Sequence, residues 1–198
     1  MSSPAELSGL VLVGGRSTRM GADKAALRYR DQPQALVTYT LLSGCCRQVL
    51  LSNRRNHAVA PELAGLPQIQ DVADNLGPMG GIVSALRTHP DRAWLVVACD
   101  LPFLTAATLR HLVAQRDPAR LATAYRSAHD GQPEPLCAIY EPAIAAELEG
   151  CVARDALCPR RALADLGAAL LKLPDPHALD NVNHPQEYAA ARAALANP

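Results

Sequence analysis

One segment near the N-terminus combines glycines with basic residues in a way that suits phosphate binding. It spans residues 12–24 and follows a short apolar run, residues 9–13. Glycines let the backbone approach a ligand and present N–H donors to phosphate oxygens. Arg16, Arg19 and Lys24 would add positive charge around the same cavity. The segment lacks the GK[ST] ending of a Walker loop and the GxGxxG fingerprint of dinucleotide-binding proteins. The alternative to a phosphate-binding loop is a glycine turn with a solvated basic face.

A single carboxylate, Asp100, comes just after the most apolar strand-like run, residues 93–98. Magnesium is a hard cation that takes one or two carboxylates together with waters and substrate phosphates. Asp100 could be such a ligand, or it could be an ordinary loop or helix-capping aspartate. Its expected position at the same sheet edge as the glycine-rich segment favours the metal-binding interpretation.

A second glycine turn, residues 77–81, opens a predicted helix and is preceded by an acidic residue, Asp71. Backbone donors and the N-terminus of a helix favour an anion nearby. Asp71 could hydrogen-bond a nucleoside amine or a ribose. The alternative is a loop followed by an ordinary helix start.

The cysteines and histidines form no recognisable metal or nucleophile pattern. Six cysteines are present without a CxxC pair or a histidine at zinc-finger spacing. Cys99 lies beside Asp100, but without a paired histidine a packed thiol is the better interpretation. We find no signal peptide and no apolar stretch approaching the roughly 20 residues of a membrane span. We therefore expect free thiols in the cytoplasm and no membrane association.

Composition indicates one globular domain without a charged field over its whole surface. The 198 residues are 49% hydrophobic and 19% charged, which suits a compact core. Lys+Arg and Asp+Glu are both 19, so the net charge is zero. We expect no nucleic-acid partner on this ground. Phosphate chemistry must then depend on a local site.

Strand-like and helix-like segments alternate along the chain. Strands are predicted at residues 9–13, 47–52, 93–98, 121–125 and 136–140, and helices at 34–43, from 78, after Thr105 and from Pro185. Such alternation predicts a three-layer α/β/α, Rossmann-like domain over residues 1–198 with a mostly parallel sheet. Ligands bind such sheets at the carboxyl ends of strands, where residues 14–15, Asn53 and Asp100 are expected.

The chain resembles the molybdenum cofactor guanylyltransferases, the MobA family, within the nucleotide-diphospho-sugar transferase-like fold. The resemblance covers nearly the whole length and depends on several motifs, which are Leu12-Val-Gly-Gly15, Arg19-Met-Gly, Asp23-Lys24, Asn53, Asp71, Gly77-Pro-Met-Gly80, Cys99-Asp-Leu-Pro102 and Asn181-Val-Asn-His-Pro185. Several nucleotidyltransferases share the first block, residues 12–24, and the Gly77-Pro-Met-Gly80 motif. The doubled glycine and the last motif narrow the resemblance to the molybdopterin branch.

The resemblance implies a role for each matching residue. A nucleotide-binding half would extend to about residue 118, and an acceptor-binding half would begin at about residue 119. The nucleotide contacts implied are Leu12, Val13, Gly14, Gly15, Lys24, Asn53, Asp71 and Asp100. The acceptor contacts implied are Gly80, Asn181 and Asn183. Lys24, Asp100 and Arg19 would be catalytic, and Asp100 would hold Mg²⁺. Val13 stands where the family usually has alanine, and residues 126–133 and 151–161 match poorly.

The reaction implied is attack by the terminal phosphate of molybdenum-bound molybdopterin on the α-phosphate of GTP, which releases pyrophosphate. Such a displacement needs positioning and charge neutralisation more than a general base. GTP and molybdenum-molybdopterin would be the substrates, with transient contacts to cofactor-inserting proteins or molybdoenzymes. Two alternatives stay open: transfer of CMP from CTP, and a non-catalytic relative that only binds nucleotide.

Overall fold

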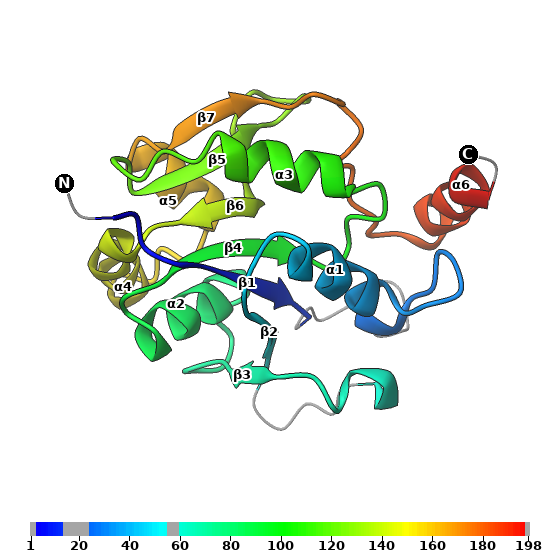
Figure 1. Cartoon of the computed structure of the whole chain (residues 1–198), viewed down its shortest axis with the longest axis horizontal. Coiled ribbons are helices and arrows are strands. Elements are labelled where there is room, and N and C mark those ends of the chain that lie inside the picture. Colours follow the sequence, from blue (N-terminus) through cyan, green and yellow to red (C-terminus); the bar gives the residue numbers. More distant parts are fainter. Residues whose placement is uncertain (1–2, 14–23, 55–59, 197–198) are drawn as a thin grey trace.

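The computed structural model describes residues 3–13, 24–54 and 60–196. Its seven strands form one sheet, shown from β7 at the top to β3 at the bottom in Figure 1. The strands are β1 (Leu7–Leu12), β2 (Val49–Asn53), β3 (Gln68–Gln70), β4 (Ala93–Ala98), β5 (Ala122–Arg126), β6 (Pro133–Tyr140) and β7 (Ala169–Lys172). The α-helices are α1 (Gln34–Ser43), α2 (Pro78–Thr88), α3 (Ala106–Ala114), α4 (Ala145–Ala153), α5 (Pro159–Asp165) and α6 (Pro185–Ala196). Short 3-10 helices are η1 (Lys24–Ala26), η2 (Pro61–Leu63) and η3 (Pro142–Ile144).

The sheet is mostly parallel, with one reversal. Its strand order is β3-β2-β1-β4-β6-β5-β7. The pairs β1–β2, β1–β4, β2–β3 and β5–β7 are parallel, whereas β6 is antiparallel to both β4 and β5. The prediction of a mostly parallel α/β sheet is confirmed. The reversal of β6 and the short strands β3 and β7 were not predicted.

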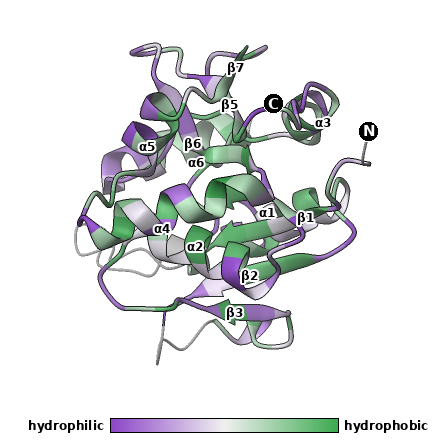
Figure 2. Ribbon diagram, turned by 90° about the vertical axis from the view of Figure 1, so that its left-hand side faces the viewer, coloured by the Kyte–Doolittle hydropathy of each residue, from purple (hydrophilic) through white to green (hydrophobic). Residues whose placement is uncertain are grey.

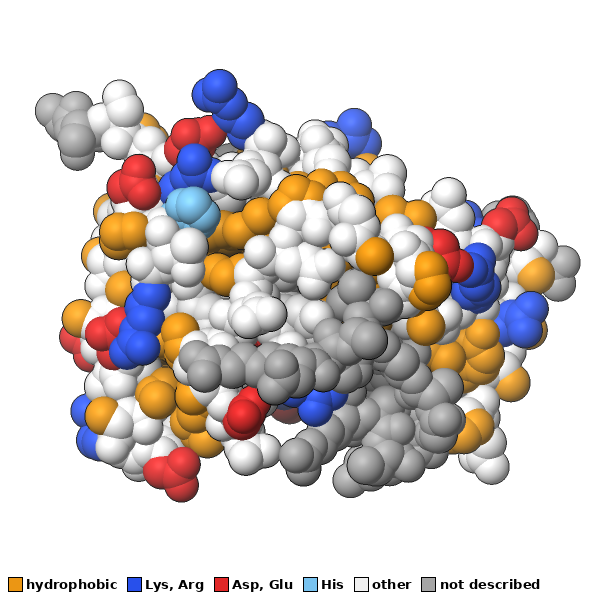
Figure 3. Space-filling view, turned by 90° about the horizontal axis from the view of Figure 1, so that it is seen from below, with side chains coloured by type: hydrophobic (Ala, Val, Ile, Leu, Met, Phe, Trp, Pro, Cys, Tyr) orange, Lys and Arg blue, Asp and Glu red, His pale blue; other side chains and the backbone are white. Residues whose placement is uncertain are grey.

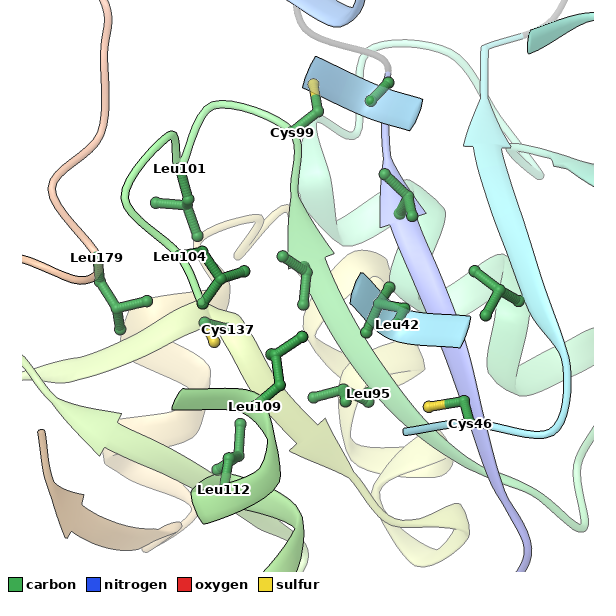
Figure 4. Packing of buried hydrophobic residues seen from close by; sticks show 14 of the residues in the cluster. Leu42, Cys46, Leu95, Cys99, Leu101, Leu104, Leu109, Leu112, Cys137 and Leu179 are labelled. Atoms are coloured by element: carbon green, nitrogen blue, oxygen red, sulfur yellow. The ribbon is translucent and has the colours of Figure 1, made fainter. Parts of the chain in front are cut away.

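Helices cover both faces of the sheet. Successive side chains of a strand point to opposite faces, so the apolar strands of this sheet have side chains to bury on each face. In β4, Leu95 and Val97 pack in one core with α1 and α3. Trp94 and Val96 pack in a second core with α2, α4 and α5. Figure 2 shows the helices on either side of the sheet, and Figure 4 shows leucines of the first core. The predicted three-layer arrangement is therefore present.

Local sequence signals explain several element boundaries. The bounds of α1 and β4 agree with the prediction, and α1 ends at Gly44. Thr105 caps α3, since its side chain accepts a hydrogen bond from the N–H of Thr108.

In the described part of the chain, no helix has the length and apolar character needed to cross a membrane. On the face shown in Figure 3, acidic and basic side chains are interspersed rather than gathered by sign.

One buried ion pair ties the end of α3 to the end of β6. Arg116 donates from Nε to Oε1 of Glu141 at 2.7 Å and from a terminal nitrogen to Oε2 at 2.8 Å. The two side chains are only 11% and 5% exposed. Removal of one side chain of such a bidentate pair is costly, because the remaining charge stays buried without its partner.

We expect Glu141→Ala to lower the free energy of unfolding by about 3 kcal/mol, since it leaves the Arg116 guanidinium buried without its carboxylate. Urea unfolding followed by circular dichroism measures this difference. Asp165→Ala is the control. Asp165 and its partner Arg161 have side chains that are 69% and 83% exposed, so their ion pair should contribute at most about 0.5 kcal/mol to the free energy of unfolding. Equal effects of the two variants would contradict the role assigned to the buried pair.

Candidate nucleotidyl-transfer site

The carboxyl ends of three neighbouring strands meet in one row. Leu12 at the end of β1 pairs in register with Ser52 of β2 on one side and with Ala98 of β4 on the other. Because β1, β2 and β4 are parallel, the residues that follow these strands come out at the same edge of the sheet. The segment that follows Ala98 contains Asp100, and the sequence placed the site at this edge.

A small cavity of about 100 Å³ lies at this edge and brings together three of the predicted nucleotide contacts. Leu12, Asp71 and Asp100 all line it. The other described lining residues are Ser52, Gly77, Pro78, Gly81, Ala98, Cys99 and Leu136. The cavity therefore lies between the ends of β1, β2 and β4 and the start of α2.

Asp71 is buried beside the end of β2, and hydrogen bonds at its backbone and its side chain hold it there. Its N–H donates to the carbonyl of Asn53 at 2.9 Å, and Ser52 Oγ donates to its Oδ1 at 2.8 Å. Asp71 is 8% exposed and Ser52 is 3% exposed. Burial raises the pKa of the Asp71 carboxyl, although the hydrogen bond from Ser52 and the charge of Arg54 act in the opposite direction. The carboxylate is thus a buried hydrogen-bond acceptor.

Helix α2 approaches the strand ends closely because two of its first residues are glycines. Pro78 is its first residue, and Gly77 before it has a φ of 57°, a conformation that favours glycine. A Cβ at Gly81 would collide with Ser52 Oγ and lie 2.7 Å from Leu12 Cδ2. A Cβ at Gly80 would lie 3.1 Å from the Leu76 Cβ and 3.5 Å from Asp71 Oδ2. Gly80, which the resemblance assigned to the acceptor side, therefore packs near Asp71.

A larger cleft of about 760 Å³ adjoins the small cavity. Asp100, Pro78 and Leu136 line both spaces. The larger cleft is otherwise formed by Leu101 and Phe103 after β4, the β5–β6 hairpin, the start of α5, residues 179–182 and one side of α6. Asn181, a predicted acceptor contact, lines it, and the N–H of Val182 donates to the Asp100 carbonyl at 3.1 Å. The segment predicted to bind the acceptor is thereby tied to the predicted metal ligand.

Other predicted residues lie near this edge without lining either cavity. Asn53 is buried at the end of β2, and its side-chain amide donates to Gln68 at 3.4 Å. Val13 is buried, and its N–H donates to the Ser52 carbonyl at 3.3 Å. The N–H of Asn183 donates to Glu187 Oε2 at 2.7 Å, which fixes the start of α6. Gly14, Gly15 and Arg19 lie outside the described residues, as does the side chain of Lys24, whose backbone opens η1.

Sequence reasoning missed a polar cluster on the far wall of the larger cleft. Arg160 bonds Asp130 at 2.8 Å and Glu134 at 3.1 Å. The Asp180 carboxylate is hydrogen-bonded to His129 Nε2 at 2.9 Å and to His177 Nδ1 at 2.8 Å. The hydrogen bond to Asp180 raises the pKa of His177. The polar residues of the β5–β6 turn were the available signal, but the antiparallel pairing that turns them toward the cleft was not predicted.

The residues at Asp100 suit a magnesium ion that is bound together with a substrate. Asp100 is half-buried and lines both cavities. Among the described residues, no group of three or more histidine, cysteine, aspartate or glutamate side chains is placed to hold a metal. Asp100, completed by waters and substrate oxygens, would match the preference of Mg²⁺ for few protein ligands and for phosphate oxygens.

Comparison of sequences places this arrangement among known proteins. A family model described as a MobA-like NTP transferase domain matches residues 9–170. The chain is 38% identical over 187 residues to a molybdenum cofactor biosynthesis bifunctional protein of Synechocystis, covering 94% of this chain and 54% of the relative. It is 42% identical over 110 residues to a molybdenum cofactor guanylyltransferase of Xanthomonas euvesicatoria, covering 54% and 53%. The matches span about half the length of these two relatives.

A solved structure supports the fold. The molybdopterin-guanine dinucleotide biosynthesis protein A of Archaeoglobus fulgidus superposes with a TM-score of 0.80 over 96% of this chain and 100% of that one. The sequence identity is 23%, so this likeness concerns the fold.

The contact between α2 and the strand ends can be tested at Gly81. We expect Gly81→Ala to lower the free energy of unfolding by about 1–3 kcal/mol, because the added methyl must displace Ser52 or Leu12. We also expect weaker nucleotide binding, measured by calorimetry. Gly65→Ala is the control, since its Cβ would meet nothing within 4 Å, and it should change stability by at most about 0.5 kcal/mol. Unchanged stability and binding in Gly81→Ala would show that the close approach is not needed.

Proposed function

This chain belongs to the MobA-like NTP transferase family, and from this we propose that it transfers GMP from GTP to the terminal phosphate of molybdenum-bound molybdopterin. Pyrophosphate is the second product. One observation carries the proposal: the cavity that contains the nucleotide-side residues and the cleft that contains Asn181 share Asp100. Two substrates that bind in these spaces would bring their phosphates together beside that carboxylate.

The base of the nucleotide is assigned to the small cavity, where Asp71 provides the main polar group. Guanine offers two adjacent donors, its ring N–H and its amino group, to a carboxylate. Cytosine offers one amino donor at the end of an edge whose other two groups, N3 and O2, are acceptors. A buried carboxylate held by Ser52 therefore favours guanine, because the wrong base leaves buried polar groups unpaired. The guanylyltransferase named among the relatives supports the same choice.

The acceptor is assigned to the larger cleft. Its terminal phosphate is already an anionic nucleophile, so the reaction needs alignment rather than proton removal. Asn181 lies in this cleft, and the bond from Val182 to Asp100 fixes the segment that contains it. The same segment continues through Asn183 into α6, where Glu187 holds it. These contacts would keep the acceptor phosphate in line with the α-phosphate.

Magnesium, when bound at Asp100, would neutralise phosphate charge and polarise the phosphoryl group. The protein would contribute further positive charge from Lys24 and Arg19 and backbone donors from residues 14–15. The dipole of α2, which begins at Pro78 beside both cavities, favours negative charge at the same point. Charge neutralisation and positioning together account for the proposed catalysis.

We also propose that the enzyme acts in the cytoplasm and passes its product to cofactor-inserting proteins or molybdoenzymes. All six cysteines are free, which suits a reducing compartment.

We expect Asp100→Asn to reduce kcat for pyrophosphate release by at least about a hundredfold, because the variant weakens metal-assisted charge stabilisation. Its unfolding midpoint should stay near that of the wild type, since Asp100 lies at the cavity rather than in the core. Asp91→Asn is the matched control, because Asp91 precedes the same strand at its opposite end. Comparable turnover of Asp100→Asn and the wild type at ordinary magnesium would place the metal ligand elsewhere.

Base preference provides a second test. We expect kcat/KM for GTP to exceed that for CTP by well above tenfold, and Asp71→Ala to remove most of this preference. Burial raises the pKa of Asp71, so protonation should begin to weaken GTP binding at a higher pH than for an exposed aspartate, and Asp71→Asn should lose this pH dependence. Equal or better use of CTP by the wild type would identify a cytidylyltransferase.

A further inference from the structure

Glu134, near the start of β6, has a carboxylate that lines the larger cleft. In the described part of the chain, only its Oε2 has a hydrogen-bond partner, which is Arg160 at 3.1 Å. The Glu134 side chain is 19% exposed, so it is largely enclosed but open to the cleft. Its second oxygen, Oε1, can therefore accept hydrogen bonds from a ligand in the cleft.

Four other carboxylates among the described residues line the same cleft, and each has another task. Asp100 is the predicted metal ligand, and Glu187 accepts from N–H groups just before α6. Both oxygens of Asp130 are bonded, one to Arg160 and one to a backbone N–H of its own turn. Both oxygens of Asp180 are bonded to histidines. Glu134 is therefore the carboxylate best placed to serve a ligand.

Glu134 also lies close to the point at which the two cavities meet. Leu136, which borders both cavities, is only two residues further along β6, and two residues of chain span at most about 7 Å. The pairing of β6 is irregular here, since Ala124 of β5 pairs with Ala138 but the next residue of β5 pairs with Glu134. The three β6 residues between these pairs all line the cleft. A ligand whose phosphate lies at the junction can therefore reach Glu134 with an attached ring.

The two ends of the larger cleft differ in chemistry. At the junction, α2 begins at Pro78, where the helix dipole favours negative charge. At the other end, the single guanidinium of Arg160 bonds two carboxylates, Asp130 and Glu134, so negative charge is in excess. This end repels a phosphate and accepts hydrogen bonds from N–H groups. Phe103 and alanines of α6 add an apolar wall on which a flat ring can pack.

We propose that Glu134 is an acceptor-binding residue that recognises the pterin ring of molybdopterin, by accepting hydrogen bonds from the ring N–H and the neighbouring amino group. The pyrimidine ring of a pterin carries these two donors side by side, as guanine does. The inference rests on the proposed function and gives the acceptor an orientation, with its terminal phosphate at Asp100 and its pterin at Glu134. The sequence motifs do not contain Glu134, and its neighbours Asp130 and Arg160 fall in the two segments that match the family poorly.

The ligand side of this proposal is tested with the wild-type protein. Equilibrium dialysis measures how well free pterin and free lumazine compete with molybdopterin for the protein. Lumazine is the same ring system with a carbonyl group in place of the amino group, so it would present an oxygen atom to the carboxylate. Pterin should therefore compete at least about tenfold better than lumazine. The absence of a preference for pterin would overturn the assignment of Glu134.

The protein side is tested with Glu134→Gln. The glutamine oxygen can still accept from Arg160, whereas the other carboxylate oxygen is replaced by an amide donor. The variant should bind molybdopterin about tenfold more weakly and lose the preference for pterin over lumazine, while calorimetry with GTP and magnesium should give unchanged affinity. Glu149→Gln is the matched control, because Glu149 also pairs with an arginine, Arg87, but lines neither cavity. It should bind both ligands as the wild type does.

Thermal unfolding first establishes that both variants are folded. Unchanged molybdopterin affinity in Glu134→Gln, an equal loss for both ligands, or a loss that leaves the pterin preference intact would each overturn the assignment. Weaker binding of GTP alone would place the guanine, rather than the pterin, at Glu134. If Glu134→Gln fails to fold, the competition between pterin and lumazine on the wild type decides the assignment. Failure of the wild type itself to bind molybdopterin would instead refute the proposed function, and this assignment with it.

Discussion

The close approach of α2 to the ends of β1 and β2 is the constraint on which the site depends. Only a glycine fits at position 81, because a Cβ there would collide with Ser52 and press on Leu12. This approach places the start of the helix, with its favourable dipole, beside the strand ends. It also closes the pocket in which Ser52 holds Asp71. A side chain at Gly81 would separate the helix from the sheet and open the cavity that the nucleotide is proposed to enter.

The single reversed strand connects this pocket to the acceptor side. Because β6 is antiparallel to β4, its early residues lie beside the late residues of β4, with Cys137 opposite Val97. Leu136 consequently borders both cavities, and residues of the β5–β6 turn line the larger cleft. The reversal therefore explains how the second half of the chain reaches the strand ends at which we propose that the nucleotide binds.

Much of the fold could be predicted from sequence, because the strongest signals are local. The continuous apolar run of β4, the glycine after α1 and the Thr105 cap identify their elements without tertiary information. The placement of Leu12, Asp71 and Asp100 around one cavity also followed from strand ends and motifs. The role of Ser52 could not be predicted, because it depends on a side-chain contact with a residue 19 positions away. The short strand β3 and the direction of β6 likewise depend on long-range pairing rather than on local pattern.

The proposed reaction transfers the α-phosphate of GTP, with its guanosine, to a phosphate bound on the other side of Asp100. Separate incubations with GTP labelled at the α- or the γ-phosphate, together with magnesium and molybdenum-molybdopterin, test this most directly. The α-label should appear in the molybdopterin dinucleotide and the γ-label in pyrophosphate. Transfer of the γ-label to the acceptor, or α-label that stays in free GTP or GMP while molybdopterin is unchanged, would contradict the account.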